Sequence, residues 1–210
     1  MSVPFRTTDV VAWTAGRLVS GDADHVFRGA GIDTRTIAKD ELFVAIRGER
    51  HDAHAFLDRA VQAGATGLLV DEAFVASGVP VPDVVVVAVD DTTRALGALA
   101  AGHRSGFAGP VVAITGSNGK TTTKEMCHAI LSVGGPTLKN PGNLNNEFGL
   151  PLTLLSREPE HVAAVVELGM NHRGEIARLT AIARPDVGIV TNVGTAHIEF
   201  LGSRENIALE

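Results

Sequence analysis

The sequence has 210 residues, of which 45% are hydrophobic and 20% charged, and its formal net charge is -6. These values suit a globular chain of one large or two small domains, and they exclude a broad nucleic-acid-binding surface, which needs a basic field. The single cysteine, Cys127, excludes an internal disulfide and a cysteine-built zinc site. Because no apolar run approaches the ~20 residues of a membrane span and the N-terminus lacks a signal-peptide pattern, we expect a cytoplasmic protein.

The first part of the chain alternates between helical and strand patterns. Helices are predicted over residues 8–18, 56–63 and 90–101, and strands over residues 41–46, 67–70 and 84–89. This alternation is typical of a small α/β domain. Three glycines, Gly102, Gly106 and Gly109, then precede Pro110, and this composition break predicts a domain boundary between residues 105 and 106.

A polar turn over residues 47–54 follows the first of these strands. It collects charged side chains, Gly48 and two histidines, His51 and His54. Taken alone it reads as a solvated loop, since loops are polar and exposed in general. Two histidines are too few to indicate a metal site.

The stretch that follows the boundary predicts a phosphate-binding loop. An apolar strand over residues 111–114 runs into Thr115-Gly-Ser-Asn-Gly-Lys-Thr-Thr122 and then into a helical pattern. Gly116 and Gly119 permit a tight loop whose N–H groups point at an anion, and the helix adds the positive end of its dipole. Lys120 supplies a charge and Thr121 a hydroxyl for a phosphate-bound Mg²⁺. The loop is shorter than the usual P-loop, which has glycine where this chain has Ile114.

Polar residues also end the two later strands, predicted over residues 161–169 and 185–190. Ligands of open α/β sheets collect beyond the carboxyl ends of the strands, so Glu167, Asn192 and His197 are expected near Lys120 if these strands are parallel neighbours. Glu167 either pairs with a lysine or arginine, or holds Mg²⁺ on nucleotide phosphates. Imidazole is a poor ligand for Mg²⁺, so residue chemistry alone makes His197 a hydrogen-bonding group.

An asparagine-rich run, Asn143-Leu-Asn-Asn146, leads into a helix predicted over residues 150–155. Amides are costly in a core without partners, so Asn143, Asn145 and Asn146 belong either to a turn or to the surroundings of a polar ligand. Another helix is predicted over residues 174–183.

Together these strings resemble the Mur ligases of peptidoglycan synthesis. The resemblance rests on residues 115–122, 143–155, 167–176 and 191–197, and on Asp33-Thr-Arg35 and residues 42–54 of the first domain. Thr34 and Ala53 stand where the family has serine and glycine. The resemblance runs from about Asp33 to the end of the chain.

The resemblance implies an α/β fold in which a small N-terminal α/β domain (residues 1–105) that binds a UDP-linked substrate is followed by a truncated P-loop-type parallel-sheet ATPase domain (residues 106–210). It also implies an ATP-dependent amide ligation. The γ-phosphoryl group of ATP would pass to the terminal carboxylate of UDP-N-acetylmuramoyl tripeptide, and the amine of D-Ala-D-Ala would attack the resulting acyl phosphate. The cofactors implied are ATP and Mg²⁺.

The site residues implied by the resemblance fall into four groups. Lys120, Glu167 and His197 are catalytic, and the loop Thr115, Gly116, Ser117, Asn118, Gly119, Lys120, Thr121 and Thr122 holds ATP. Thr121 and Glu167 would hold one Mg²⁺, and His197 a second metal. The uridine diphosphate end of the substrate would be contacted by Thr34, Arg35, Gly48 and His54. The muramoyl-peptide end would be contacted by Asn143, Asn145, Asn146 and Asn192.

Members of the family continue into a third domain and carry a carbamylated lysine that would lie just beyond Glu210. We therefore expect this chain to be a catalytically silent fragment without the C-terminal domain, able to self-associate through an uncovered sheet edge. Two alternatives stay open: another ligase of the superfamily, of the folylpolyglutamate type, or a non-catalytic module that binds a nucleotide or UDP-sugar. The sequence does not decide between lysine and diaminopimelate in the peptide, nor does it give the oligomeric state.

Overall fold

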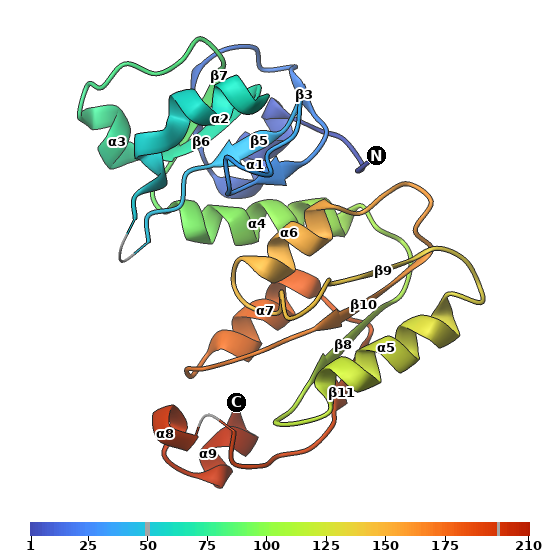
Figure 1. The fold of residues 1–210 in the computed structure, drawn as a ribbon. Coiled ribbons are helices and arrows are strands. Elements are labelled where there is room, and N and C mark those ends of the chain that lie inside the picture. Colours follow the sequence, from blue (N-terminus) through green and yellow to red (C-terminus); the bar gives the residue numbers. More distant parts are fainter. Residues whose placement is uncertain (49–50, 197) are drawn as a thin grey trace. The chain divides into compact units, whose positions relative to one another are not determined.

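The computed structural model describes residues 1–48, 51–196 and 198–210 of the chain. They form two compact units, Met1–His103 and Arg104–Glu210 (Figure 1), which we describe separately. Both units are α/β, and most strand pairs are parallel, which confirms the predicted fold class.

The first unit contains a five-stranded sheet in the order β2-β7-β6-β5-β4, in which only the β2–β7 pair is antiparallel. Its strands are β2 (Arg17–Ser20), β4 (Ala30–Gly31), β5 (Leu42–Val44), β6 (Gly67–Asp71) and β7 (Val85–Val89), and a small antiparallel pair joins β1 (Phe5–Arg6) to β3 (Val26–Phe27). The helices are α1 (Thr7–Thr14), the 3-10 helix η1 (Ala53–Phe56), α2 (Leu57–Ala63), α3 (Glu72–Ala76) and α4 (Thr92–Ser105), of which the last two residues belong to the second unit. Every residue of β6 and β7 is buried, as expected for central parallel strands covered on both faces.

Two helix predictions in this unit were wrong at their ends. The helix predicted over residues 8–18 ends at Thr14, because Ala15 takes a left-handed conformation (φ 52°) and Leu18 instead pairs with Val87 in the sheet. The helix predicted over residues 90–101 continues to Ser105. Gly102 therefore lies inside a helix: a Cβ there would be 2.2 Å from Cγ of Trp13, so this glycine serves close packing and does not break the helix.

The second unit contains a four-stranded, fully parallel sheet in the order β11-β8-β10-β9. Its strands are β8 (Val111–Thr115), β9 (Thr137–Lys139), β10 (Ala163–Glu167) and β11 (Val187–Val190), and its helices are α5 (Lys120–Leu131), α6 (Gly149–Leu155), α7 (Glu175–Ala183), α8 (Ile198–Leu201) and α9 (Arg204–Leu209). Helix α5 covers one face of this sheet, and α6 and α7 lie on the other (Figure 1).

The register brings the carboxyl ends of three strands together. Glu167 of β10 pairs with Ile114, and Val190 of β11 pairs with Thr115, so β8 ends between its two neighbours. The parallel neighbours on which the shared-crevice prediction depended are therefore present. Strand β9 was not predicted.

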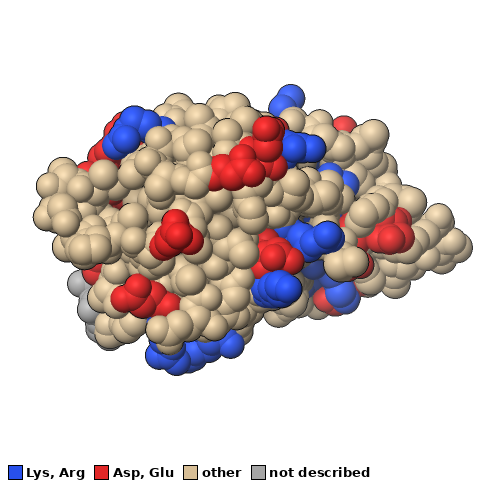
Figure 2. Space-filling model, turned by 90° about the horizontal axis from the view of Figure 1, so that it is seen from above, with Lys and Arg blue, Asp and Glu red and all other residues tan. Residues whose placement is uncertain are grey.

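The surface of the chain carries both signs of charge. On the face shown in Figure 2, lysine and arginine side chains are interspersed with aspartate and glutamate. Within the described ranges no helix has the length and apolar character to cross a membrane. Strand β11 lies at a sheet edge with Val187 and Val190 51% and 63% exposed, and self-association through this edge stays a prediction.

Candidate functional site

The loop between β8 and α5 depends on two glycines. Gly116 has φ 131° and Gly119 has φ 82°, both in the region that favours glycine. A Cβ on Gly116 would lie 2.2 Å from Oγ1 of Thr191. Helix α5 begins at Lys120, so its free N–H groups and the positive end of its dipole face this loop.

Residues that follow β11 hold the loop in place. Oγ1 of Thr191 donates to the carbonyl of Asn118 (2.6 Å), and the Gly194 N–H donates to Oγ of Ser117 (2.8 Å). The side-chain amide of Asn192 is bonded to both main-chain groups of Asn118, since Asn118 N donates to Oδ1 (3.1 Å) and Nδ2 donates to Asn118 O (3.3 Å). Asn192 thus shapes the phosphate loop, and its predicted contact with the substrate stays a prediction.

Lys120 lines a cavity in the second unit. Its Nζ donates to the carbonyl of Gly116 (2.8 Å), and in the part of the chain that the structure describes it forms no ion pair with a carboxylate. The cavity has a volume of about 220 Å³ and is lined by Lys120, Asn145, Asn146, Glu147, Gly169, Met170, Asn171, Glu175, Arg178 and Leu179. A lysine whose only partner is a carbonyl can turn to an incoming phosphate, because it leaves no charged partner behind.

Glu167 is a buried carboxylate held by uncharged donors. The residue is 2% exposed. Oγ1 of Thr121 donates to Oε2 (2.8 Å), and Nδ2 of Asn145 donates to Oε1 (2.7 Å). Among the described residues Glu167 has no lysine or arginine partner, so the ion-pair alternative left open by the sequence is not what these residues show.

This arrangement fits Mg²⁺. A buried carboxylate without a cation is costly, and a carboxylate beside a hydroxyl offers two of the hard oxygen ligands that Mg²⁺ prefers. The described residues contain no group of three or more histidine, cysteine, aspartate or glutamate side chains that could bind a metal by itself. Mg²⁺ on a nucleotide needs only one or two protein carboxylates, since phosphates and water complete its shell. His197, predicted for a second metal, lies outside the described residues.

The three predicted asparagines have different surroundings. Asn145 bonds Glu167 and lines the cavity. Asn146 also lines it, while its Oδ1 accepts from the N–H of Gly149 (2.9 Å) at the start of α6. Asn143 is exposed, and its carbonyl accepts from the Asn145 N–H in a turn. The turn alternative is therefore seen at Asn143, and the ligand alternative stays a prediction for Asn145 and Asn146, which line the cavity.

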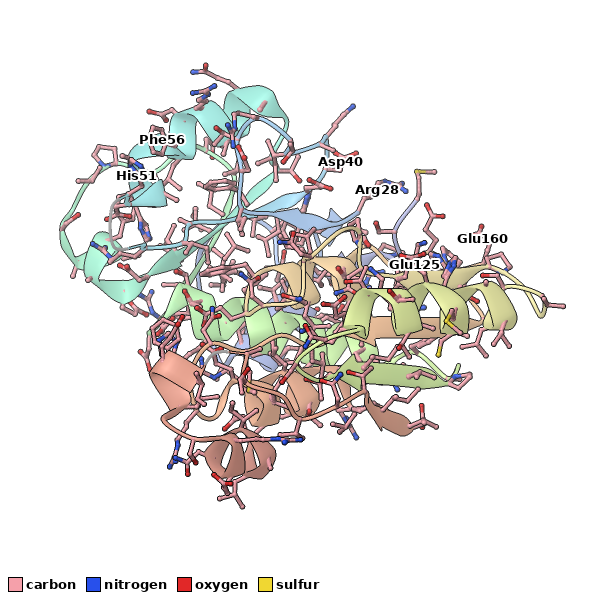
Figure 3. The ribbon with its side chains drawn as sticks, turned by 60° about the horizontal axis from the view of Figure 1, so that its bottom comes forward. Arg28, Asp40, His51, Phe56, Glu125 and Glu160 are labelled. Atoms are coloured by element: carbon pink, nitrogen blue, oxygen red, sulfur yellow. The ribbon has the colours of Figure 1, made fainter. Side chains whose placement is uncertain are left out.

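The first unit has a larger cavity of about 620 Å³. It is lined by Ile32, Asp33, Thr34, Arg35, Phe43, Ile46, Gly48, His51, Ala53, Phe56 and Arg59, which include three of the four residues predicted for the uridine diphosphate end. His51 and Phe56 lie close together near the start of α2 (Figure 3). Sequence reasoning did not select Phe56 or Arg59; an aromatic residue at the start of the helix predicted over residues 56–63 was a signal that could have indicated Phe56.

Arg35 is oriented by the neighbouring Asp33. The Nε atom of Arg35 donates to Oδ1 of Asp33 (2.9 Å), and its main-chain N–H donates to the same oxygen (2.9 Å). The side-chain hydrogen bond from Arg35, followed by the backbone one, lowers the pKa of Asp33 to about 2. The guanidinium is thus held at the cavity with its charge partly balanced.

His54 lies outside this lining. It is 7% exposed, with Nδ1 2.6 Å from Oδ1 of Asp52 and Nε2 accepting from the Asp71 N–H at 3.1 Å. Because Nε2 accepts, the proton resides on Nδ1 and is donated to Asp52. His54 therefore links Asp52 to the main chain of Asp71, and a direct contact with substrate stays a prediction.

Comparison with known proteins identifies the family of the chain. The profile of the Mur ligase middle domain matches residues 114–210, and that of the Mur ligase family, catalytic domain, matches residues 26–104. The chain belongs to the Mur ligase family, which confirms the resemblance of its motifs.

Within the family, the chain is similar to UDP-N-acetylmuramoyl-tripeptide–D-alanyl-D-alanine ligases. It is 46% identical to the one from Synechocystis sp. over 176 residues, which are 84% of this chain and 38% of the relative. It is 46% identical to the one from Escherichia coli over 186 residues, which are 89% of this chain and 40% of the relative. The chain thus spans about two fifths of the length of these curated relatives.

Solved structures give the same result. A crystal structure of MurF from Acinetobacter baumannii superposes with a TM-score of 0.88 and 37% identity, covering 99% of this chain and 45% of that one. MurF ligase from Thermotoga maritima in complex with ADP superposes with a TM-score of 0.76 and 36% identity, covering 86% of this chain and 41% of that one.

Proposed function

We propose that this chain provides the nucleotide and UDP-substrate sites of a cytoplasmic ligase that adds D-Ala-D-Ala to UDP-N-acetylmuramoyl tripeptide at the expense of ATP. The observation that carries this proposal is the buried Glu167 carboxylate bonded to Thr121 of the phosphate loop, beside Lys120. Three features meet at the carboxyl ends of neighbouring strands: the phosphate loop, a lysine that pairs with no carboxylate among the described residues, and a buried carboxylate that pairs with no lysine or arginine among them. They suit phosphoryl transfer, which depends on positioning and charge stabilisation. The proposed substrates are those in the names of the similar ligases.

Each group in the second unit has a role in this proposal. The loop N–H groups and the start of α5 bind the ATP phosphates, and Lys120 leaves the Gly116 carbonyl for the β- and γ-phosphates. Thr121 and Glu167 would hold Mg²⁺, which when bound neutralises charge on the transferring phosphoryl group. Asn145 keeps the Glu167 carboxylate aimed at Thr121, and His197 is proposed for a second metal.

The reaction proceeds through two displacements. A carboxylate oxygen of the peptide attacks the γ-phosphorus of ATP. The bond between the γ-phosphorus and the oxygen that bridges the β- and γ-phosphates breaks, and ADP leaves. The amine of D-Ala-D-Ala then attacks the carbonyl carbon of the acyl phosphate, loses a proton, and expels inorganic phosphate. Asn143, Asn145, Asn146 and Asn192 are proposed to face the muramoyl-peptide end, of which Asn145 and Asn146 line the cavity at Lys120.

The cavity of the first unit is proposed to bind the uridine diphosphate end. Arg35 and Arg59 offer positive charge for a diphosphate, and Phe56 and His51 offer rings for the uracil. Thr34 and Gly48 add small polar groups to the same lining. His54 would act indirectly, through its hydrogen bonds with Asp52 and the Asp71 N–H.

Ligand-dependent stability tests the proposal. A ligand at 100 times its dissociation constant stabilises the folded chain by about 2.7 kcal/mol. We expect ATP with Mg²⁺ and UDP-N-acetylmuramoyl tripeptide each to stabilise the wild-type chain, and Lys120→Ala to remove only the ATP effect. No stabilisation by the UDP-linked tripeptide, together with stabilisation by a folate, would favour a folylpolyglutamate-type ligase instead.

A further inference from the structure

One side-chain amide completes the sheet beside Glu167. Strand β9 ends at Lys139, which pairs with Val165, whereas β10 continues to Glu167. The fully buried Asn140 fills the gap: its Oδ1 accepts from the Glu167 N–H (2.9 Å), and its Nδ2 donates to the Glu167 carbonyl (3.1 Å). Strand β9 does not continue past Lys139, and the Asn140 carbonyl accepts from Lys124 Nζ. The Asn140 amide therefore stands in for one further peptide group of β9.

A buried lysine anchors Asn140. Nζ of Lys124, whose side chain is 1% exposed, donates to the carbonyls of Asn140 (2.9 Å) and Gly142 (3.2 Å). Its charge is balanced by Oε1 of Glu125 at 3.4 Å, a half-exposed residue of α5 labelled in Figure 3. Lys124 lies one turn after Lys120 on α5, so the anchor and the phosphate-binding lysine belong to one rigid helix.

The anchored segment also reaches the carboxylate itself. Nδ2 of Asn140 donates a second hydrogen bond to the Leu144 carbonyl (2.9 Å), which fixes the chain just before Asn145. Asn145 in turn bonds Oε1 of Glu167, and its carbonyl accepts from the Gly169 N–H (2.8 Å). One segment, residues 140–145, therefore holds both the main chain and the carboxylate of Glu167 in position by hydrogen bonds.

We propose that Asn140, anchored by Lys124, is a positioning residue for the Glu167 carboxylate. The inference rests on the proposed function, in which Glu167 holds Mg²⁺ on a nucleotide. Groups that orient a metal ligand typically change metal affinity by about 10- to 100-fold when they are removed. The phosphate loop makes none of these hydrogen bonds, so we expect nucleotide binding without a metal to be unchanged when Asn140 or Lys124 is replaced.

The test compares ADP affinity in excess Mg²⁺ with ADP affinity in EDTA, by calorimetric titration of the whole chain. We expect Asn140→Ser and Lys124→Met to reduce the ratio of the two affinities by about 10-fold or more, with the EDTA affinity unchanged. Lys139→Met is the matched control, since the Lys139 side chain also pairs with Glu125 but donates no hydrogen bond to residues 140–145. In a Glu167→Gln chain, adding Asn140→Ser should change neither affinity.

The outcomes separate the two claims. Equal losses in Mg²⁺ and EDTA, or an unchanged ratio, overturn the positioning role. A wild-type chain that does not bind ADP in either condition overturns the proposed function. In that case amide hydrogen exchange of the wild-type and Lys124→Met chains tests the inference. Faster exchange of the Glu167 amide in Lys124→Met, with an unchanged rate at Val165, supports the role of Lys124 as the anchor. An unchanged exchange rate at Glu167 overturns it.

Discussion

Replacing Glu167 by glutamine should stabilise the ligand-free chain while removing its response to Mg²⁺. The carboxylate is 2% exposed and its two partners, Thr121 and Asn145, are uncharged. A glutamine can keep both hydrogen bonds, because its oxygen accepts from Asn145 and the Thr121 hydroxyl can rotate to accept from its amide nitrogen.

The size of the effect follows from two opposing contributions. Burying an ion costs several kcal/mol, which Glu167→Gln recovers. Two hydrogen bonds to a charged acceptor, each contributing about 1.5–3 kcal/mol, become neutral ones contributing about 0.5–1.5 kcal/mol. We therefore expect the free energy of unfolding to rise by about 1–2 kcal/mol, as at other sites where function conflicts with stability.

Urea unfolding of both chains, with ADP affinity measured in Mg²⁺ and in EDTA, checks this prediction. Glu160→Gln is the control, because Glu160 is exposed (Figure 3) and its change should alter neither stability nor affinity. A Glu167→Gln chain that is less stable than wild type, or that keeps the full gain in affinity from Mg²⁺, would refute the reasoning about an uncompensated carboxylate.

Two further predictions concern the loop and the first cavity. Gly116→Ala should lower the free energy of unfolding by about 1–3 kcal/mol and weaken ADP binding, because its φ of 131° is unfavourable for alanine and a Cβ there would lie 2.2 Å from Thr191. Gly188→Ala is the control, since Gly188 has open space around it. Equal unfolding midpoints for the two variants would contradict the prediction. Arg35→Met should return the pKa of Asp33 from about 2 toward the ordinary aspartate range, as followed by NMR titration of the carboxyl carbon. Because the pKa of Asp33 is lower in the folded chain than in the unfolded chain, the Asp33–Arg35 pair stabilises the fold at pH values above the unfolded-state pKa, and this stabilisation is lost as the pH falls toward 2. A wild-type Asp33 that titrates near the ordinary aspartate pKa would contradict this.

Features set by local chemistry could be predicted from the sequence. The phosphate loop is one of them, because Gly116 and Gly119 are needed for its backbone and Lys120 and Thr121 follow directly in the chain. The parallel strands and the position of Glu167 at a strand end also follow from apolar runs that end in polar residues. Local pattern is sufficient where a backbone conformation or a buried strand determines the residue type.

Features set by distant partners could not be predicted. The helix α1 stops where it does because Leu18 pairs with Val87, and Gly102 stays helical because Trp13 packs on it. The same holds for Asn140, whose role depends on Glu167 in the neighbouring strand. Strand β9, which ends just before Asn140, was not predicted from the residue pattern. Such contacts join residues far apart in the chain and leave no local period.

Titration of ATP into the wild-type chain, once with Mg²⁺ and once with EDTA, tests the central claim most directly. The site described here predicts binding that is at least about 10-fold tighter with Mg²⁺, which corresponds to about 1.4 kcal/mol, because Thr121 and Glu167 add ligands that the metal-free nucleotide cannot use. Equal affinities in the two titrations, or no binding in either, would contradict it.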